Sequence, residues 1–274
     1  MQNNIVIFGK GGIGKSTVAA NLSSVYALQG RKVLHVGCDP KHDSTLSLVD
    51  GGLIETFMEK YSRVSGVRDR GELKSSDILV RGRLGIDCVE AGGPEPGVGC
   101  AGRGISLMLE ALQDLGILRS GDYDARIFDV LGDVVCGGFA APLRKGFAEK
   151  IVIVVSEELM ALYAANNIAK SVKTYASNGV YLAGLVANLK DGQVERERIE
   201  RFAETLGTRV LEFLPRDPAV RKAEFARDRT VVERNPRAPF SKSLESLAAK
   251  IWSIRKEDCP IPTPMDDRRF YGGW

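Results

Sequence analysis

A glycine-rich stretch near the N-terminus constrains the fold of this chain more than any other feature. Gly9-Lys10-Gly11-Gly12-Ile13-Gly14-Lys15-Ser16-Thr17 follows the short apolar run Ile5–Phe8 and opens a stretch with helical spacing of apolar residues. The pattern G-x-x-x-x-G-K-[ST] between a strand and a helix is typical of loops whose backbone amides surround a polyphosphate. Lys15 is expected to contact the β- and γ-phosphates and Ser16 to bind Mg²⁺, with positive potential added by the helix N-terminus. We therefore predict a nucleotide site at residues 9–17.

Short β-branched runs alternate with helical stretches along the rest of the chain. This alternation predicts an α/β fold with a doubly wound, mostly parallel sheet that is covered by helices on both faces. We expect strands at Ile5–Phe8, Val33–Val36, Leu84–Val89, Ala125–Val130, Ile151–Val155, Leu182–Ala187 and Arg209–Phe213. We expect helices at Ser16–Leu28, Ser106–Leu115, Leu159–Ala176, Val194–Leu206 and Ser241–Arg255, from the spacing of their apolar residues.

The length of 274 residues suits one α/β domain, which we expect to span residues 1–257. Residues 258–274 are predicted to form an irregular tail over the surface, because they combine prolines with the charged run Asp266-Asp267-Arg268-Arg269. The aromatic end of this tail, Phe270-Tyr271-Gly272-Gly273-Trp274, is expected either to pack on a partner subunit or to fray.

Charge and hydropathy exclude several classes of partner. The 38 basic and 35 acidic residues give a net charge of +3 and form no basic stripe of the kind expected in a nucleic-acid binder. No segment approaches the roughly 20 apolar residues of a transmembrane helix, and the N-terminus lacks the pattern of a signal peptide. We therefore expect a cytoplasmic protein that binds neither nucleic acid nor membrane. Its five cysteines, an odd number, argue against a disulfide framework.

Two acidic clusters follow predicted strands. They are Asp39-Pro40-Lys41-His42-Asp43-Ser44 and Asp129-Val130-Leu131-Gly132-Asp133. Carboxylates at the carboxyl end of a parallel sheet face the same crevice as the glycine-rich loop. There they could orient water, hold Mg²⁺ through its hydration shell and sense the γ-phosphate. From the sequence alone, each aspartate could equally be a capping or turn residue.

Two cysteines lie in glycine-rich segments that suit a metal centre. Cys100 is part of residues 90–104, and Cys136 lies within residues 132–139, directly after the second acidic cluster. A [4Fe-4S] cluster usually takes four thiolates, and two copies of a Cys100/Cys136 pair would supply four. The alternative is that both are small buried apolar side chains, as free cysteines usually are. We interpret Cys38 and Cys88 as structural, and find no ligand pattern around Cys259, His35 or His42.

Several motifs resemble the nitrogenase iron protein family over nearly the whole chain. Lys10 resembles the extra lysine of the deviant Walker A ATPases, a group that includes MinD, ParA and the nitrogenase iron proteins. The matching stretches are Gly9–Thr17, Gly37–Thr45, Gly92–Gly104, Phe128–Phe139, Tyr163–Ile168 and Phe213–Asp217. The resemblance implies a P-loop NTPase fold of the SIMIBI/NifH type, and a homodimer that binds ATP and Mg²⁺ and bridges one [4Fe-4S] cluster.

The resemblance also implies roles for individual residues. Cys100 and Cys136 correspond to the cluster ligands, and Lys10 to the lysine that reaches the partner's nucleotide. Positions at the nucleotide and in the switch segments are matched by Lys15, Ser16, Asp39, Lys41, Asp43, Asp129 and Asp133. Those that contact the purine are matched by Asn188 and Pro215-Arg216-Asp217. Arg103 matches an arginine of the docking face that is ADP-ribosylated in some family members.

In function, the resemblance implies an electron donor that is loaded with MgATP and docks on a larger catalytic component, passing one electron per cycle. A ferredoxin or flavodoxin is the expected source of electrons. Residues 41–44 and 137–143 look like the donor of dark-operative protochlorophyllide reductase, whereas residues 92–104 look like nitrogenase. This mosaic favours a separate branch, with methylthio-alkane reductase preferred and tetrapyrrole reductases and nitrogenase left open. A MinD/ParA-like positioning ATPase is the rival from another class.

Overall fold

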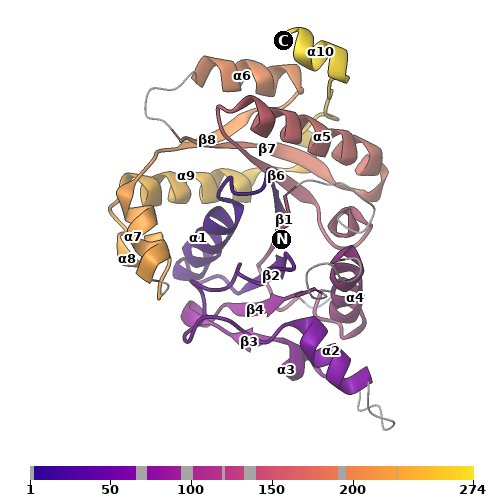
Figure 1. Ribbon diagram of the computed structural model, residues 1–274, viewed down its shortest axis with the longest axis vertical. Coiled ribbons are helices and arrows are strands. Elements are labelled where there is room, and N and C mark those ends of the chain that lie inside the picture. Colours follow the sequence, from indigo (N-terminus) through magenta and orange to yellow (C-terminus); the bar gives the residue numbers. More distant parts are fainter. Residues whose placement is uncertain are drawn as a thin grey trace.

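The computed structural model describes residues 3–65, 73–93, 101–118, 121–132, 140–190, 196–226 and 228–274. Within these ranges, eight strands form one sheet in the order β3-β4-β2-β5-β1-β6-β7-β8 (Figure 1). Neighbouring strands are parallel except for the antiparallel pair of β3 and β4. The strands are β1 (Asn3–Phe8), β2 (Val33–Cys38), β3 (Val80–Arg81), β4 (Asp87–Glu90), β5 (Ala125–Val130), β6 (Lys150–Val155), β7 (Tyr181–Asn188) and β8 (Val210–Leu214).

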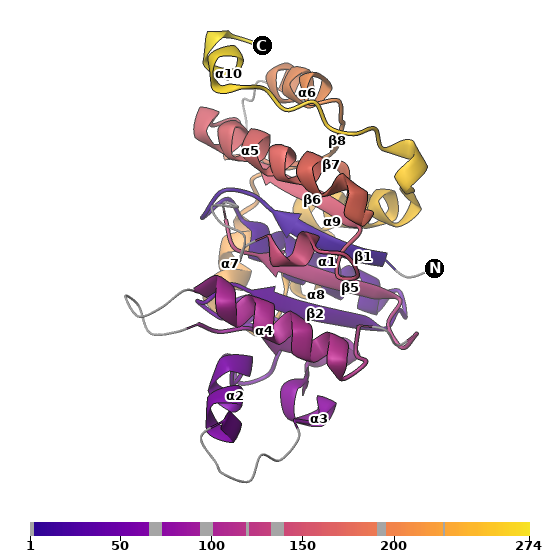
Figure 2. The same cartoon turned by 90° about the vertical axis from the view of Figure 1, so that its right-hand side faces the viewer.

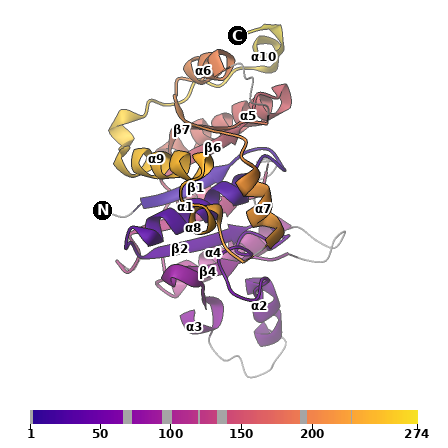
Figure 3. The same cartoon turned by 90° about the vertical axis from the view of Figure 1, so that its left-hand side faces the viewer.

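Helices cover both faces of the sheet, because alternate residues of its buried strands point to opposite sides. In β1, Val6 and Phe8 belong to the apolar cluster on one face, and Ile5 and Ile7 to the cluster on the other. Helices α4 and α5 lie over the first face (Figure 2) and α1 and α9 over the second (Figure 3). The longer helices are α1 (Lys15–Leu28), α2 (Phe57–Ser65), α4 (Ala101–Asp114), α5 (Leu159–Tyr175), α6 (Arg196–Thr205), α7 (Pro218–Ala226) and α9 (Pro239–Ser253).

The position of β1 determines where a ligand can bind. This strand lies between β5 and β6. Strands β2 to β5 lie on one side of it and strands β6 to β8 on the other. The loop that follows Phe8 therefore emerges at the carboxyl edge of the sheet, next to the ends of β5 and β6. In open α/β sheets the crevice at this edge is the usual ligand site.

The seven predicted strands and five predicted helices are all present, which confirms the doubly wound α/β prediction. The expected strand Leu84–Val89 begins only at Asp87, because Arg83–Gly85 forms a 3₁₀ turn with Leu84 at a φ of 54°. The helix expected at Ser106 already begins at Ala101. The sequence reading missed β3, α2 and α7, together with the short helices α3 (Ser75–Ile78), α8 (Val231–Arg234) and α10 (Asp267–Gly272).

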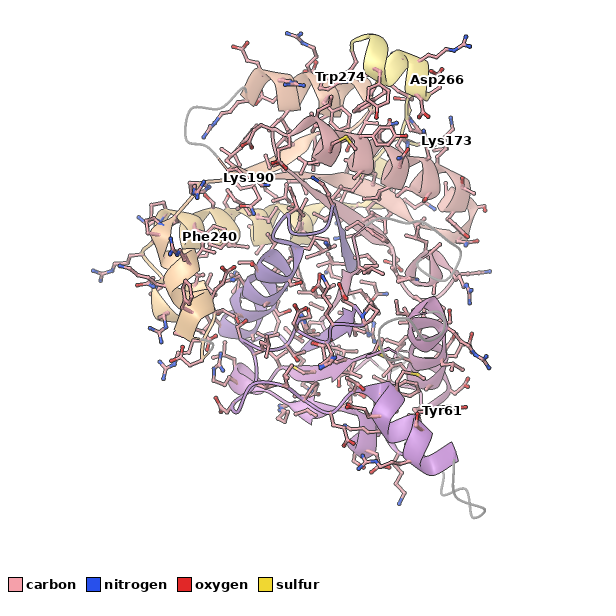
Figure 4. All side chains as sticks on the ribbon, in the orientation of Figure 1. Tyr61, Lys173, Lys190, Phe240, Asp266 and Trp274 are labelled. Carbon is pink, nitrogen blue, oxygen red and sulfur yellow. The ribbon has the colours of Figure 1, made fainter. Side chains whose placement is uncertain are left out.

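The tail from residue 258 is more ordered than expected, and the prediction of an irregular segment is wrong over α10. The Asp266 side chain caps this helix by accepting a hydrogen bond from the Arg269 backbone amide. Phe270 is only 1% exposed, and Trp274 packs on Phe202 of α6 with ring centroids 4.9 Å apart. The end of the tail thus packs on its own subunit. Figure 4 shows Asp266 and Trp274 at the top of the view.

A pair of hydrogen bonds anchors the start of this helical tail. The Asn166 side chain on α5 donates to the Met265 carbonyl oxygen and accepts from the Met265 amide, both at 2.8 Å. Both residues are buried, so these bonds satisfy backbone groups that have lost contact with water. Within the described ranges, every helix is too short or too polar to serve as a membrane span.

Candidate functional site

The predicted phosphate loop connects the end of β1 to α1 and has a backbone that only glycine accommodates at two points. Gly9 has a φ of 149°, and a Cβ atom there would lie 2.4 Å from the Val154 carbonyl oxygen of β6. Gly14 has a φ of 96° and forms the N-terminal cap of α1. A Cβ atom at Gly14 would lie 2.5 Å from the Asn188 side-chain nitrogen. The loop is therefore held close to β6 and β7, with its following helix pointing an N-terminus at the crevice.

The two lysines of the loop have different surroundings. The Lys15 ammonium is buried and donates to the Lys10 carbonyl oxygen at 3.2 Å, across the mouth of the loop. The Lys10 side chain is more exposed and lies 3.8 Å from a carboxylate oxygen of Glu158, at the start of α5. Glu158 also accepts a hydrogen bond from Lys190 at 2.9 Å. Lys15 is thus held against its own loop, and both its contact with phosphate and the reach of Lys10 to a partner's nucleotide stay predictions.

The first acidic cluster forms a turn beside the phosphate loop. Asp39 accepts a hydrogen bond from the Lys41 amide at 3.0 Å, so it serves as the turn residue that the alternative reading expected. Lys41 and Asp43 are exposed. Asp43 lines a cavity, and the residues around this cavity include Ser16, Thr17, Asn21, Ser44, Ser47, Glu224, Arg229 and Thr230. The cavity brings Ser16 and Asp43 together as the sequence predicted.

Asp129 is a buried carboxylate of β5, one residue before the strand ends at Val130. It is 2% exposed, and its Oδ2 accepts a hydrogen bond from Ser44 at 2.6 Å. Burial raises the pKa of Asp129 to about 6, although the Ser16 and Ser44 hydroxyls and the Lys15 charge oppose this rise. Among the described residues, its Oδ1 has no hydrogen-bond partner. An unpartnered buried carboxylate oxygen next to Ser16 fits the hydrated Mg²⁺ that accompanies a bound nucleotide.

The predicted purine-contacting residues line a second cavity, which shares Thr17 and Glu224 with the first. Asn188 donates to the Ile13 carbonyl oxygen at 2.8 Å. Arg216 donates to the Lys190 carbonyl oxygen, and Asp217 caps two helices by accepting from the amides of Ala219 and Phe240. The cavity is lined by Gly12, Ile13, Gly14, Thr17, Asn188, Leu189, Lys190, Pro215, Arg216, Asp217, Val220, Arg221, Glu224 and Phe240. Figure 4 labels Lys190 and Phe240 at this site.

The predicted cluster ligands Cys100 and Cys136, and with them Asp133, lie outside the described residues. Arg103 is exposed on the first turn of α4. Cys38 and Cys88 are buried, and burial raises the pKa of both thiols, whereas Cys259 is half-buried. In the part of the chain that the structure covers, no three His, Cys, Asp and Glu side chains are grouped to hold a metal ion.

Comparison with known proteins identifies the family of this chain. Residues 3–271 match the family described as 4Fe-4S iron sulfur cluster binding proteins, NifH/frxC family. The chain belongs to this family. It is a NifH-like P-loop ATPase, with nucleotide and Mg²⁺ as the ligands that suit the loop, the Asp43 cavity and Asp129.

Several solved structures share the fold. MinD complexed with Mg-ADP from Pyrococcus horikoshii OT3 has a TM-score of 0.70 at 21% identity, and the match covers 95% of this chain and 100% of that one. MinD from Pyrococcus furiosus has a TM-score of 0.68 at 22% identity, with 90% and 98% covered. A ParA family ATPase from Chlorobium tepidum TLS has a TM-score of 0.66 at 18% identity, with 90% and 98% covered. At these identities the likeness concerns the P-loop NTPase fold.

The structure adds residues to the site of this NifH/frxC family member that the sequence reading did not find. Glu224 of α7 accepts a hydrogen bond from Thr17 at 2.9 Å and borders both cavities. The sequence signal for α7, the helix that carries Glu224, is Asp217-Pro218, because an aspartate cap followed by proline is a common helix start. Glu90 at the end of β4 is fully buried, and its Oε1 accepts from the Thr45 amide at 2.8 Å. No local sequence pattern indicated this second buried carboxyl.

Proposed function

We propose that this ATPase is the electron-donor component of a nitrogenase-like reductase. It would act as a homodimer in which Cys100 and Cys136 of both copies hold one [4Fe-4S] cluster, and a ferredoxin or flavodoxin would reduce it. When bound, such a cluster supplies one-electron transfer, with a potential set by the surrounding amides and solvent. The membership of a family named for 4Fe-4S binding supports the cluster, and the two cysteine-containing segments support its link to nucleotide.

One observation carries the proposal: the described residues just before the two cysteine-containing stretches, Gly93 and Gly132, lie against loops of the nucleotide site. A Cβ atom at Gly93, seven residues before Cys100, would lie 2.8 Å from the Pro40 side chain. A Cβ atom at Gly132, four residues before Cys136, would lie 2.9 Å from the Gly11 amide nitrogen. The backbone leading to each cysteine is thus in contact with a segment of the nucleotide site.

The same region is packed closely enough to transmit a displacement. A Cβ atom at Gly92 would lie 2.5 Å from Thr56, and one at Gly104 would lie 3.1 Å from Met58 of α2. The Thr45 amide is hydrogen-bonded to Glu90, which precedes the Gly92-Gly93 segment. Packed segments move as units and do not deform continuously. A shift of residues 39–45 on nucleotide exchange would therefore shift the backbone that leads to Cys100.

The cluster is tested by purifying the full chain without oxygen and measuring iron, sulfide and the electron paramagnetic resonance of the reduced protein. We expect about four irons per dimer, with the signal lost in Cys100→Ser and Cys136→Ser. Cys259→Ser is the matched control, since Cys259 is a half-buried thiol with no proposed ligand role. A colourless, iron-free dimer would instead favour the MinD/ParA-like positioning ATPase, whose fold this chain shares.

Coupling is tested by following extraction of iron by a chelator with MgADP or MgATP present. We expect different rates with the two nucleotides, because the loops that contact them also contact Gly93 and Gly132. Asp133→Asn is expected to bind ATP but to lose most of this difference and of the electron transfer. Equal extraction rates in the wild-type protein would count against the link, and wild-type turnover in Asp133→Asn would count against the role of Asp133.

For the substrate branch we propose methylthio-alkane reductase, which cleaves C–S bonds, with tetrapyrrole reductases and nitrogenase as alternatives. The support is the mosaic of residues 41–44, 137–143 and 92–104, in which no one known branch matches throughout. The test is to trap the complex with MgADP and aluminium fluoride in the cell's own extract and to identify the partner and its cofactor. A large iron–sulfur cofactor with turnover of an alkyl sulfide would support this branch. A bound tetrapyrrole, or turnover of dinitrogen, would replace it.

A further inference from the structure

A continuous chain of buried hydrogen bonds connects the phosphate-loop helix to Asp129 through a histidine. Ser23 of α1 lies 2.8 Å from His35 Nδ1, and His35 Nε2 lies 2.8 Å from the Ser44 hydroxyl. The Ser44 hydroxyl in turn donates to Asp129 Oδ2 at 2.6 Å. All four residues are at most 2% exposed. Three segments of the nucleotide site, namely α1, residues 39–45 and the end of β5, are thereby joined through one imidazole ring.

The bonding pattern assigns a single tautomer to this ring. Ser44 has one hydroxyl proton and donates it to the Asp129 carboxylate, so its oxygen can only accept from His35. His35 Nε2 therefore carries the proton, and Nδ1 accepts the Ser23 hydroxyl proton. Burial lowers the pKa of His35 to about 3, and the ring stays neutral at physiological pH. The direction of the whole chain, from Ser23 to Asp129, is thus defined.

This chain decides which oxygen of Asp129 remains available to a ligand. Ser44 engages Oδ2, whereas Oδ1 is buried and has no partner in the described part of the chain. Ser44 lines the same cavity as Ser16 and Asp43. Without a donor from His35, the Ser44 hydroxyl could rotate away, and the carboxylate could turn with it.

We propose that His35 is a positioning residue of the nucleotide site, whose Nε2–H orients Ser44 so that Asp129 presents Oδ1 to hydrated Mg²⁺. This inference rests on nucleotide binding by the NifH-like fold and is independent of the electron-donor role. A histidine that only fills the core would contribute to stability alone. A positioning histidine changes the coupling between Mg²⁺ and nucleotide, which can be measured without turnover.

Two amide substitutions separate these roles, because glutamine places its nitrogen near His Nε2 and asparagine near Nδ1. His35→Gln keeps a donor for Ser44, whereas His35→Asn keeps a group facing Ser23 and loses that donor. The measurement is the affinity for ADP of the full-length anaerobic protein, with Mg²⁺ and with EDTA, by calorimetry. In His35→Asn we expect the Mg²⁺-dependent gain in ADP affinity to fall about tenfold, as for loss of one bond to a charged group. In His35→Gln we expect it to stay within about twofold of wild type.

Equal loss of ADP affinity with and without Mg²⁺ in both variants would overturn the proposal, as would an unchanged Mg²⁺ effect in His35→Asn. Should either variant fail to fold, the wild-type protein still gives a test. The chain has two histidines, so ¹⁵N-histidine labelling resolves both rings by nuclear magnetic resonance. The Nε2–H tautomer of His35 is expected from pH 7 to 8, where the Asp129 carboxyl is ionised, and an Nδ1–H tautomer in this range would refute the argument. Neither readout depends on iron content, so failure of the electron-donor proposal would be seen separately.

Discussion

Glu90→Gln is expected to make the stability of this protein less dependent on pH. The Glu90 carboxyl is fully buried over Gly37, where a Cβ atom would lie 1.8 Å from its Oε2. Burial raises the pKa of Glu90 from 4.5 to about 8, and the hydrogen bond from the Thr45 amide only partly opposes this. The carboxyl is therefore protonated in the folded protein at neutral pH and ionised in the unfolded chain.

The sign of the effect follows from proton binding. Between pH 4.5 and about 8 the folded state holds one proton more than the unfolded state at Glu90, so stability falls as pH rises. At about 1.4 kcal/mol per pKa unit, the whole interval corresponds to at most about 5 kcal/mol. Glutamine has no proton to lose and keeps an oxygen for the Thr45 amide. The variant should thus gain stability over wild type by up to about 1.4 kcal/mol per pH unit across this window.

The assay is urea denaturation of the nucleotide-free protein at pH 5.5, 6.5, 7.5 and 8.5 without oxygen. We expect the free energies of unfolding of wild type and Glu90→Gln to diverge as pH rises towards about 8 and to level off above it. The control is Glu245→Gln, since Glu245 is an exposed glutamate on α9, and its curve should run parallel to wild type. Parallel curves for Glu90→Gln as well would show that Glu90 is ionised in the folded protein and would refute the reasoning.

Three further changes probe the loop and the tail. Gly9→Ala should lower the free energy of unfolding by about 2 to 4 kcal/mol and abolish nucleotide binding, because its Cβ atom would lie 2.4 Å from the Val154 carbonyl oxygen. Thermal unfolding and a fluorescent-nucleotide titration check this. Asn166→Leu leaves the buried amide and carbonyl of Met265 unpaired, so limited proteolysis should remove the tail faster. The free energy of unfolding in urea should fall by about 2 to 3 kcal/mol. An unchanged cleavage rate would contradict the anchoring role. Phe270→Ala should lower the free energy of unfolding, measured by the same urea denaturation, by about 3 to 5 kcal/mol, because it leaves a cavity under α10. A decrease of less than about 1 kcal/mol would mean that the tail is not part of the core.

Local sequence pattern was sufficient for the framework of the site. The alternation of apolar runs located seven strands, and the glycine spacing of residues 9–17 located the loop between β1 and α1. Asp43, Asp129 and Asn188 also lie at this edge of the sheet, as their positions near the ends of predicted strands or after them indicated. These predictions succeeded because each depends on residues near in sequence, or on the rule that parallel strands end at one edge.

Tertiary structure alone decided the contacts that tune the site. Ser44 and Asp129 are 85 positions apart, and Glu90 and Thr45 are 45 apart, so no local pattern could pair them. His35 shows the difference most clearly, since it looks in the sequence like one residue of a buried strand. Its role depends on two hydroxyls from different segments that meet its ring only after the sheet has assembled. The sequence determined where the glycine-rich loop lies, and packing determined that Ser44 bonds both His35 and one oxygen of Asp129, because hydrogen-bond partners are selected by distance in the fold.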